Sequence, residues 1–265
     1  MKQSILDRLP RNHPWAGNIH YFDTITSTNT EAKRLASAGA PHGTVVIAGH
    51  QTGGRGRMGR SFHSPAGLGI YLSVILRPEG APGDLMHLTC AAAVAMCDAV
   101  ESAAGFRPGI KWTNDLVHGQ QKLGGILTEL SLGVDHHINY AIVGIGINCL
   151  HTEKDFPAEL RDMAGSLAMV SPAPVDTTKV ATAMIEELFL MSQCLLTDKA
   201  AIMDRYRADC VTVGKAVSVH RFEEVRHGTA ISVDDNGGLV VRFDDGHTET
   251  VAAGEVSIRG MYGYV

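Results

Sequence analysis

One stretch of ten residues concentrates charge and glycine in a way that indicates ligand chemistry. Residues 51–60, here called the arginine loop, read QTGGRGRMGR, with three arginines among four glycines. Such a segment is too rich in glycine for a helix and too charged for a core. Guanidinium forks and open backbone amides suit phosphate or carboxylate oxygens. The arginine loop therefore predicts an anion site; a solvated surface loop or a nucleic-acid-binding RG segment is the alternative.

The arginine loop also satisfies the letters of the dinucleotide fingerprint GxGxxG, from Gly54 to Gly59. That fingerprint requires a helix to begin at the loop, so that its N-terminus faces the pyrophosphate. The chain instead continues RSFHSPAGLG, in which Ser64-Pro65 and Gly67 oppose a helix. No Gly-Lys-Ser/Thr follows either, as a P-loop would need. We expect an irregular loop that holds anions by its arginines.

A second group of polar residues follows in KWTND, which begins at Lys111, and in KLGG, which begins at Lys122. If a hairpin joins the two segments, both lysines approach Asn114 and Asp115. Two ammonium groups beside a carboxylate suit a nucleoside triphosphate with Mg²⁺. The alternative is a surface turn with Trp112 packed beneath it.

Glycines interrupt two otherwise apolar strands. Gly124 and Gly125 lie in KLGGILTEL, and GIGIN spans residues 144–148. A glycine inside a strand indicates close approach of a ligand or of other backbone. Asn148 ends the second strand with an amide that could read a polar ligand edge, or simply form a structural turn.

The elements that must position these residues alternate between strands and helices. A helix is expected over residues 27–39, because Thr28 and Glu31 have the capping-box spacing and Gly39 is a plausible stop. Apolar runs and turn signals give the remaining elements. They are strands at 19–24, 43–50, 68–76, 109–112, 115–130 with a turn at 119–121, and 137–147, and helices at 84–104, 177–196 and 199–209.

Short alternating strands with Asn-Gly and Asp-Gly turns fill the chain beyond residue 211. The sequence therefore predicts an α+β protein of two domains. Residues 1–211 would form a mixed sheet with helices, and residues 212–265 a small β-barrel.

Composition narrows the function classes. The 265 residues carry a formal charge of −5, which disfavours a protein that coats nucleic acid. Five cysteines without a CxxC pair indicate neither a zinc site nor a disulfide framework. The N-terminus lacks a signal-peptide pattern, and the apolar stretch around 88–100 contains Asp98 and is expected to be too short to span a bilayer. We expect a cytoplasmic protein without a membrane or nucleic-acid partner.

These motifs, in this order, resemble those of the biotin–protein ligases, also called biotin–[acetyl-CoA-carboxylase] synthetases. The matching segments are STNTEAK, GHQTGGRGRMGRSFHSPAGLGIYLSVILRP, IKWTNDL, KLGGILTEL and VGIGIN. The resemblance implies a catalytic domain like that of class II aminoacyl-tRNA synthetases and an SH3-like C-terminal barrel. It implies that ATP and Mg²⁺ activate biotin to biotinyl-5′-AMP. The biotinyl group then passes to a lysine of the biotin carboxyl carrier domain of acetyl-CoA carboxylase.

The resemblance also assigns roles to individual residues. Biotin would be held by Ser27, Thr28, Asn29, Gln51, Arg55, Gly56, Arg57, Lys122, Gly124 and Gly125. The nucleotide would be held by Arg55, Arg57, Arg60, Lys111, Asn114, Asp115, Lys122 and Asn148. Arg57, Lys111 and Lys122 would be the catalytic cations, with Asp115 near the metal of Mg-ATP. Phe62 would keep an aromatic wall where other members have Trp.

Four further expectations follow. About 20 residues precede the first matching motif, so the winged helix-turn-helix of the repressor members is expected to be absent, and DNA binding with it. Edge strands could pair two copies into a homodimer, although no self-association motif is visible. The main rival is a lipoate or octanoate ligase or transferase on the same fold, which would lack KWxND. We also expect the arginine loop to close over bound biotin and ATP, shielding the mixed anhydride from water.

Overall fold

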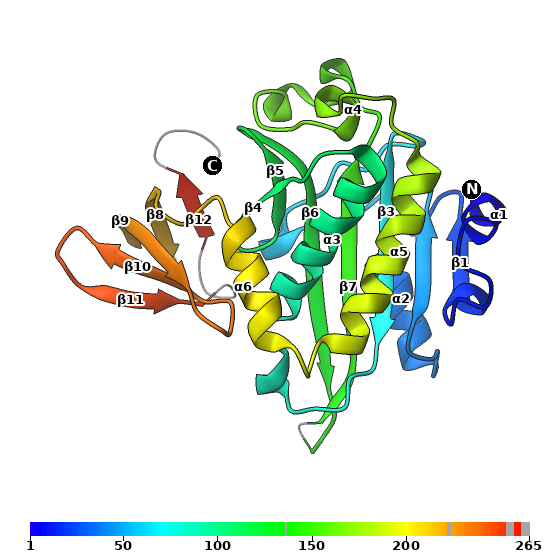
Figure 1. The fold of residues 1–265 in the computed structure, drawn as a ribbon, viewed down its shortest axis with the longest axis horizontal. Helices are drawn as coiled ribbons and strands as arrows, with labels where there is room; N and C mark the ends of the chain where they lie inside the picture. Colours follow the sequence, from blue (N-terminus) through cyan, green and yellow to red (C-terminus); the bar gives the residue numbers. More distant parts are fainter. Residues whose placement is uncertain (136, 222–223, 253–256, 261–265) are drawn as a thin grey trace.

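A computed structural model of the chain describes residues 1–135, 137–221, 224–252 and 257–260 (Figure 1). The helices are α1 (Lys2–Leu6), α2 (Thr28–Ser37), α3 (Leu88–Ala104), α4 (Leu167–Val170), α5 (Thr177–Cys194) and α6 (Lys199–Asp209). The first seven strands are β1 (Ile19–Phe22), β2 (Thr44–Ala48), β3 (Gly69–Leu76), β4 (Gly109–Lys111), β5 (Asp115–His118), β6 (Gln121–Leu132) and β7 (Ile138–Asn148). The last five are β8 (Ala216–Arg221), β9 (Glu224–Val233), β10 (Leu239–Phe243), β11 (Thr248–Val251) and β12 (Ser257–Gly260).

The first seven strands form one sheet in the order β1-β2-β3-β7-β6-β5-β4. β1 and β2 pair in parallel, and every other neighbouring pair is antiparallel. The expected mixed sheet with helices is therefore confirmed. The predicted turn at residues 119–121 falls between β5 and β6, where Gly119 has a positive φ of 56°.

Helices cover both faces of this sheet. α3 and α5 pack on one face, seen in front of the sheet in Figure 1, and α2 lies on the other. Along β2, Val45 and Ile47 join the core of the first face, whereas Val46 packs with Ala32 and Ala36 of α2. Covering on both faces explains why β2 and β3 are continuous apolar runs, since alternation marks a strand with one wet face.

The helical stretch Pro82–Ala104 is 23 residues long, with a mean hydropathy of 1.2 in its most apolar window. By length and composition it could cross a membrane, so the expectation that this stretch is too short is wrong. Its surroundings explain its composition: 72% of that window is buried between the sheet, α5 and α6. α3 is apolar nearly all round because other elements pack against most of its surface.

The capping box expected at the start of α2 is wrong. Ser27 is the N-cap by backbone conformation, and its side chain makes no capping hydrogen bond. The Thr28 hydroxyl instead donates to Gln51 Oε1 (3.1 Å), and the Glu31 carboxylate binds Arg34. The spacing predicted the start of the helix correctly, but the Thr28 side chain binds Gln51 and does not cap the helix.

β8 to β12 form a separate antiparallel sheet in the order β11-β10-β9-β8-β12. The expected small β domain is thus present as a five-stranded sheet; among the residues described, no pairing joins β11 to β12 and closes a barrel. Residues 253–256 and 261–265 of the predicted domain lie outside the described residues.

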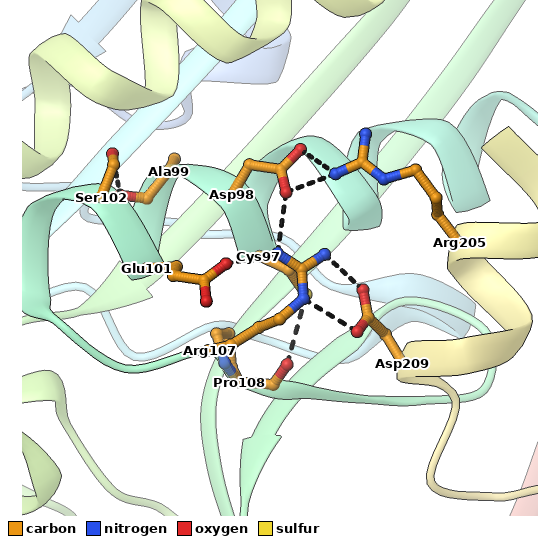
Figure 2. A network of polar contacts seen from close by, with 9 residues as sticks. All are labelled: Cys97, Asp98, Ala99, Glu101, Ser102, Arg107, Pro108, Arg205 and Asp209. Carbon is orange, nitrogen blue, oxygen red and sulfur yellow. Dashed lines mark hydrogen bonds and ion pairs between the residues drawn. The ribbon is translucent and has the colours of Figure 1, made fainter. Parts of the chain in front are cut away.

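An arginine fastens α6, which precedes this second sheet, to α3 and to the start of β4 in the seven-stranded sheet. The Arg107 guanidinium binds Asp209 through two nitrogens (2.6 and 2.8 Å) and also binds Asp98 and Glu101, each at 2.8 Å (Figure 2). The hydrogen bonds that Arg107 donates to Asp209 and the other carboxylates raise the pKa of Arg107 above its ordinary value. Arg205 of α6 reaches Asp98 as well, so α3 and α6 are held at a fixed spacing.

Candidate functional site

A cavity of about 940 Å³ opens between the N-terminus of α2, the arginine loop and the strands β4 to β7. Thirteen of the predicted site residues line it together. They are Ser27, Thr28, Asn29, Gln51, Arg55, Gly56, Arg57, Arg60, Lys111, Asn114, Asp115, Lys122 and Gly125. The structure therefore brings three sequence motifs that are far apart in the chain to one space.

One end of the cavity is a network of neutral hydrogen-bonding groups. Gln51 Oε1 accepts from the Thr28 backbone N–H (2.8 Å) and hydroxyl (3.1 Å). Gln51 Nε2 donates to the Ser64 hydroxyl at 3.0 Å. The Ser73 hydroxyl lies 2.8 Å from Thr28 Oγ1 and 2.6 Å from Asn29 Oδ1 and can donate to either. These side chains are fixed by one another before a ligand arrives.

The other end of the cavity is cationic. Arg57 Nη1 donates to Asn114 Oδ1 at 2.7 Å, and Lys122 Nζ lies 2.6 Å from Asp115 Oδ1. Asn114 Nδ2 in turn donates to Asp115 Oδ1 (3.2 Å) and to the Ile126 carbonyl (3.0 Å). Burial lowers the pKa of Arg57, against the opposing charge of Asp115, although arginine stays protonated. Lys111 of β4 and Lys122 of β6 both line this cavity with Asn114 and Asp115, which is the common site that the hairpin prediction expected.

KWTND is fixed from behind by the second sheet and by α6. The Trp112 indole N–H donates to the Gly237 carbonyl (2.9 Å), and its backbone N–H donates to Thr212 Oγ1 (2.9 Å). The fully buried Tyr206 hydroxyl donates to the Thr113 carbonyl at 3.1 Å. Trp112 therefore packs structurally, as the alternative interpretation held, and it also lines the cavity, which was not predicted from the sequence.

Two predicted site residues do not line the cavity. A Cβ at Gly124 would lie 2.6 Å from the Gly146 carbonyl oxygen, so this glycine serves strand packing. Asn148 is buried, and its amide donates to the Gly165 carbonyl at 3.0 Å, outside the cavity lining. The predicted ligand contacts of these two residues are not supported by their positions.

The glycines of GIGIN make room for protein side chains. A Cβ at Gly144 would lie 1.8 Å from Asn29 Oδ1, and a Cβ at Gly146 would lie 2.4 Å from Phe62 Cε1. Phe62 lines the cavity as an aromatic wall, in edge-to-face contact with Tyr71. The glycines were correctly associated with the site, but they shape it by admitting Asn29 and Phe62.

Sequence reasoning missed other groups at the cavity. Met58, Ser61, Gln120, Ile126, Leu127, Ile145, Asp162 and Met163 also line it. Met163 arrives through backbone pairing, since its carbonyl accepts from the Lys122 N–H at 2.7 Å. No motif marked residues 162–163, because only the tertiary fold brings this loop beside Lys122.

Among the described residues, no group of three or more His, Cys, Asp or Glu side chains could hold a metal ion. The described part of the chain therefore offers no site at which protein side chains alone would bind a metal. Asp115 and Asp162, which both line the cavity, offer carboxylate oxygens. Magnesium commonly binds through one or two carboxylates together with substrate phosphates, and Asp115 fits that arrangement.

Hydrogen-bonding groups and several cations around one cavity suit a polar, anionic ligand. Comparison with known proteins agrees. The Biotin/lipoate A/B protein ligase family matches residues 21–148, and the Biotin protein ligase C terminal domain matches residues 212–259. The class is thus that of the biotin and lipoate ligases.

Individual relatives narrow the class. The chain is 35% identical over 234 residues to the bifunctional ligase/repressor BirA of Bacillus subtilis, covering 86% of this chain and 70% of that protein. It is 32% identical over 237 residues to the biotin–[acetyl-CoA-carboxylase] ligase of Mycobacterium tuberculosis, covering 87% and 85%. The biotin protein ligase of Aquifex aeolicus, solved with biotin and ATP, superposes with a TM-score of 0.77 at 26% identity, covering 92% and 99%. The chain belongs to the biotin–protein ligase family.

Proposed function

We propose that this protein joins biotin to a lysine of a biotin carboxyl carrier domain in two steps. In the first, a biotin carboxylate oxygen attacks the α-phosphorus of ATP. The bond from the α-phosphorus to the bridging oxygen breaks, and pyrophosphate leaves with that oxygen. In the second, a neutral lysine amine attacks the carbonyl carbon of biotinyl-5′-AMP, AMP leaves, and the amine loses a proton. The observation that carries this proposal is one cavity lined both by the neutral hydrogen-bonding network of Thr28 and Gln51 and by the cations Arg57 and Lys122.

The two ends suit the two substrates. Ser27, Thr28, Asn29 and Gln51 would surround the biotin head group, and Phe62 and Gly125 would border its body. A carboxylate and a polyphosphate repel each other, and the cations must offset that repulsion to bring them into contact. Arg57 and Lys122 lie where both anions would meet.

The remaining polar groups suit the nucleotide. Lys111, Asn114 and Arg60 would contact its phosphates or ribose, with Gly56 allowing close approach of the loop backbone. Arg55, predicted for both ligands, would face biotin, because it pairs with Glu129 beside Asn29. Mg²⁺ would enter with ATP and neutralise the phosphate charge, near Asp115. Asp115 also holds Lys122 at 2.6 Å, so it orients the cation that faces both substrates.

Finer features of the molecule are part of this proposal. We place the domain boundary at 211/212 and regard the catalytic domain as related to class II aminoacyl-tRNA synthetases and the C-terminal domain as SH3-like. The acceptor would be the carrier domain of acetyl-CoA carboxylase, the substrate named for the mycobacterial relative. The five free cysteines support a reducing, cytoplasmic setting. A homodimer stays a prediction, which size-exclusion chromatography with light scattering would test.

The test is intact-mass analysis of a carrier domain incubated with the protein, biotin and Mg-ATP, with lipoate and octanoate in parallel. A biotinyl mass increase that needs ATP is expected. Arg57→Ala and Lys122→Ala should slow it about a hundredfold or more, because each removes a cation from the reacting anions. Arg34→Ala is the matched control, since Arg34 pairs with Glu31 on the surface of α2. A lipoyl or octanoyl product without a biotinyl product would establish the rival activity.

A further inference from the structure

A carboxylate just outside the cavity contacts side chains from two of the segments that form the biotin end. Glu129 of β6 does not line the cavity, but its Oε2 accepts from Asn29 Nδ2 at 2.9 Å. Its Oε1 accepts from Lys33 Nζ (2.5 Å) and lies 3.5 Å from Arg55 Nη1. Asn29 and Lys33 belong to α2, whereas Arg55 belongs to the arginine loop. Glu129 thus joins two segments that are separate in the chain.

The contact with Asn29 completes the hydrogen bonding of that amide. Its Nδ2 donates to Glu129 and to the Leu127 carbonyl (3.3 Å), and its Oδ1 lies within reach of the Ser73 hydroxyl. Both amide protons are therefore directed into the protein. Asn29 lines the cavity, and Glu129 sets the orientation of its side chain. The Glu129 carboxylate therefore helps to determine the shape of the cavity.

The contact with Arg55 acts on the loop. The Arg55 side chain is 49% exposed, so it can adopt many rotamers unless an anion restrains it. Glu129 is 19% exposed and charged: burial raises its pKa, but hydrogen bonds from Lys33 and Asn29 outweigh burial and hold the pKa below its usual value. A fixed negative charge at this point draws the Arg55 guanidinium to the wall of the cavity.

From these contacts we infer that Glu129 is a positioning residue for biotin, acting through Asn29 and Arg55. The inference rests on the proposed function. It locates the effect at one end of the cavity, since none of the three partners of Glu129 contacts Asn114, Asp115 or Lys122 in the hydrogen bonds and ion pairs described. Loss of the Glu129 charge should therefore weaken biotin binding and leave ATP binding unchanged.

The test compares Glu129→Gln with wild type by calorimetric titration with biotin and by carrier-biotinylation kinetics with each substrate varied. The Kd and the KM for biotin should rise about three- to tenfold, because one or two partly exposed charged hydrogen bonds are lost. The KM for ATP should stay within about twofold of the wild-type value. Glu31→Gln is the matched control, because it removes a carboxylate from α2 that binds Arg34. It should behave as wild type.

A double-mutant cycle with Arg55→Met separates positioning from general damage. If Glu129 acts through Arg55, the double variant should lose less biotin affinity than the sum of the two single losses. Unchanged or tighter biotin binding by Glu129→Gln would overturn the inference, as would a parallel rise of both KM values or fully additive losses. A wild-type protein that neither binds nor transfers biotin would instead overturn the proposed function, and this inference with it.

Discussion

Gly144→Ala is expected to disable biotin binding although it adds a single methyl group. In an ordinary strand this change is mild or favourable, because alanine loses less backbone entropy than glycine. Here the new Cβ would lie 1.8 Å from Asn29 Oδ1, 2.6 Å from Cγ and 2.8 Å from Nδ2. Distances under 3 Å to three atoms of one amide leave no room for that amide, so the Asn29 side chain must move.

The cost follows from the hydrogen bonds of Asn29. Displacement breaks the contacts with Glu129, the Leu127 carbonyl and Ser73. At a net value of about 1 kcal/mol for each bond, the fold should lose about 2–3 kcal/mol of unfolding free energy. The same displacement places an amide in the biotin end of the cavity, and biotin affinity should fall at least about tenfold.

Calorimetry with biotin and urea unfolding would measure the two effects. Gly17→Ala is the control, because a Cβ there meets nothing within 4 Å. Adding Asn29→Ala to Gly144→Ala should cost no further stability, since the hydrogen bonds of Asn29 are already broken, and it should not recover affinity. The reasoning is refuted if Gly144→Ala binds biotin as wild type does, or if the second substitution lowers stability further.

Two other perturbations test separate parts of the structure. Tyr206→Phe and Thr212→Val each remove a buried hydrogen bond behind KWTND, so KM for ATP should rise about three- to tenfold while KM for biotin stays constant. Lys199→Met, which breaks an exposed contact with the C-terminal sheet, should leave both unchanged. Burial, together with the charge of nearby His63, lowers the pKa of His151 to about 4. Between pH 6.5 and 4, His151 is therefore protonated in the unfolded chain but stays neutral in the folded protein, which favours unfolding. Unfolding free energy should fall by about 3 kcal/mol over that range, and urea titrations of His151→Phe should show a flatter profile; an unchanged pH slope would contradict this.

Much of the fold could be predicted because its signals are local. α6 was predicted with its observed bounds, and α5 was predicted two residues longer than it is. The apolar strands β2 and β3 were visible because both of their faces are buried. Strand order was not predictable: β3 pairs with β7 across more than sixty intervening residues, and no local pattern encodes that neighbour.

The cations of the site could be predicted from the sequence, but the side chains that bind those cations could not. Arginines in a glycine loop and lysines in KWTND and KLGG are conspicuous in the sequence, because charged residues cluster there between apolar strands. Glu129 was missed, although one signal existed: it follows Gly125 and Leu127 at intervals of two, on the strand face that borders the cavity. A single carboxylate in an apolar strand is otherwise easily read as a solvent-facing residue. Gly124 and Asn148 lie outside the cavity lining, because glycine and asparagine at strand positions serve packing as readily as binding.

The partners of the cations explain how the cavity can be both charged and ordered. Arg57 is held by Asn114, Lys122 by Asp115 and Arg55 by Glu129. A cation restrained by a neighbouring acceptor needs little reorganisation when an anion arrives, which is the condition under which electrostatic stabilisation accelerates a reaction. Of the three acceptors only Asn114 is neutral, and the other two are carboxylates that also reduce the net positive charge of the cavity. The pocket can therefore collect several cations in a chain of net charge −5 without leaving them to repel one another.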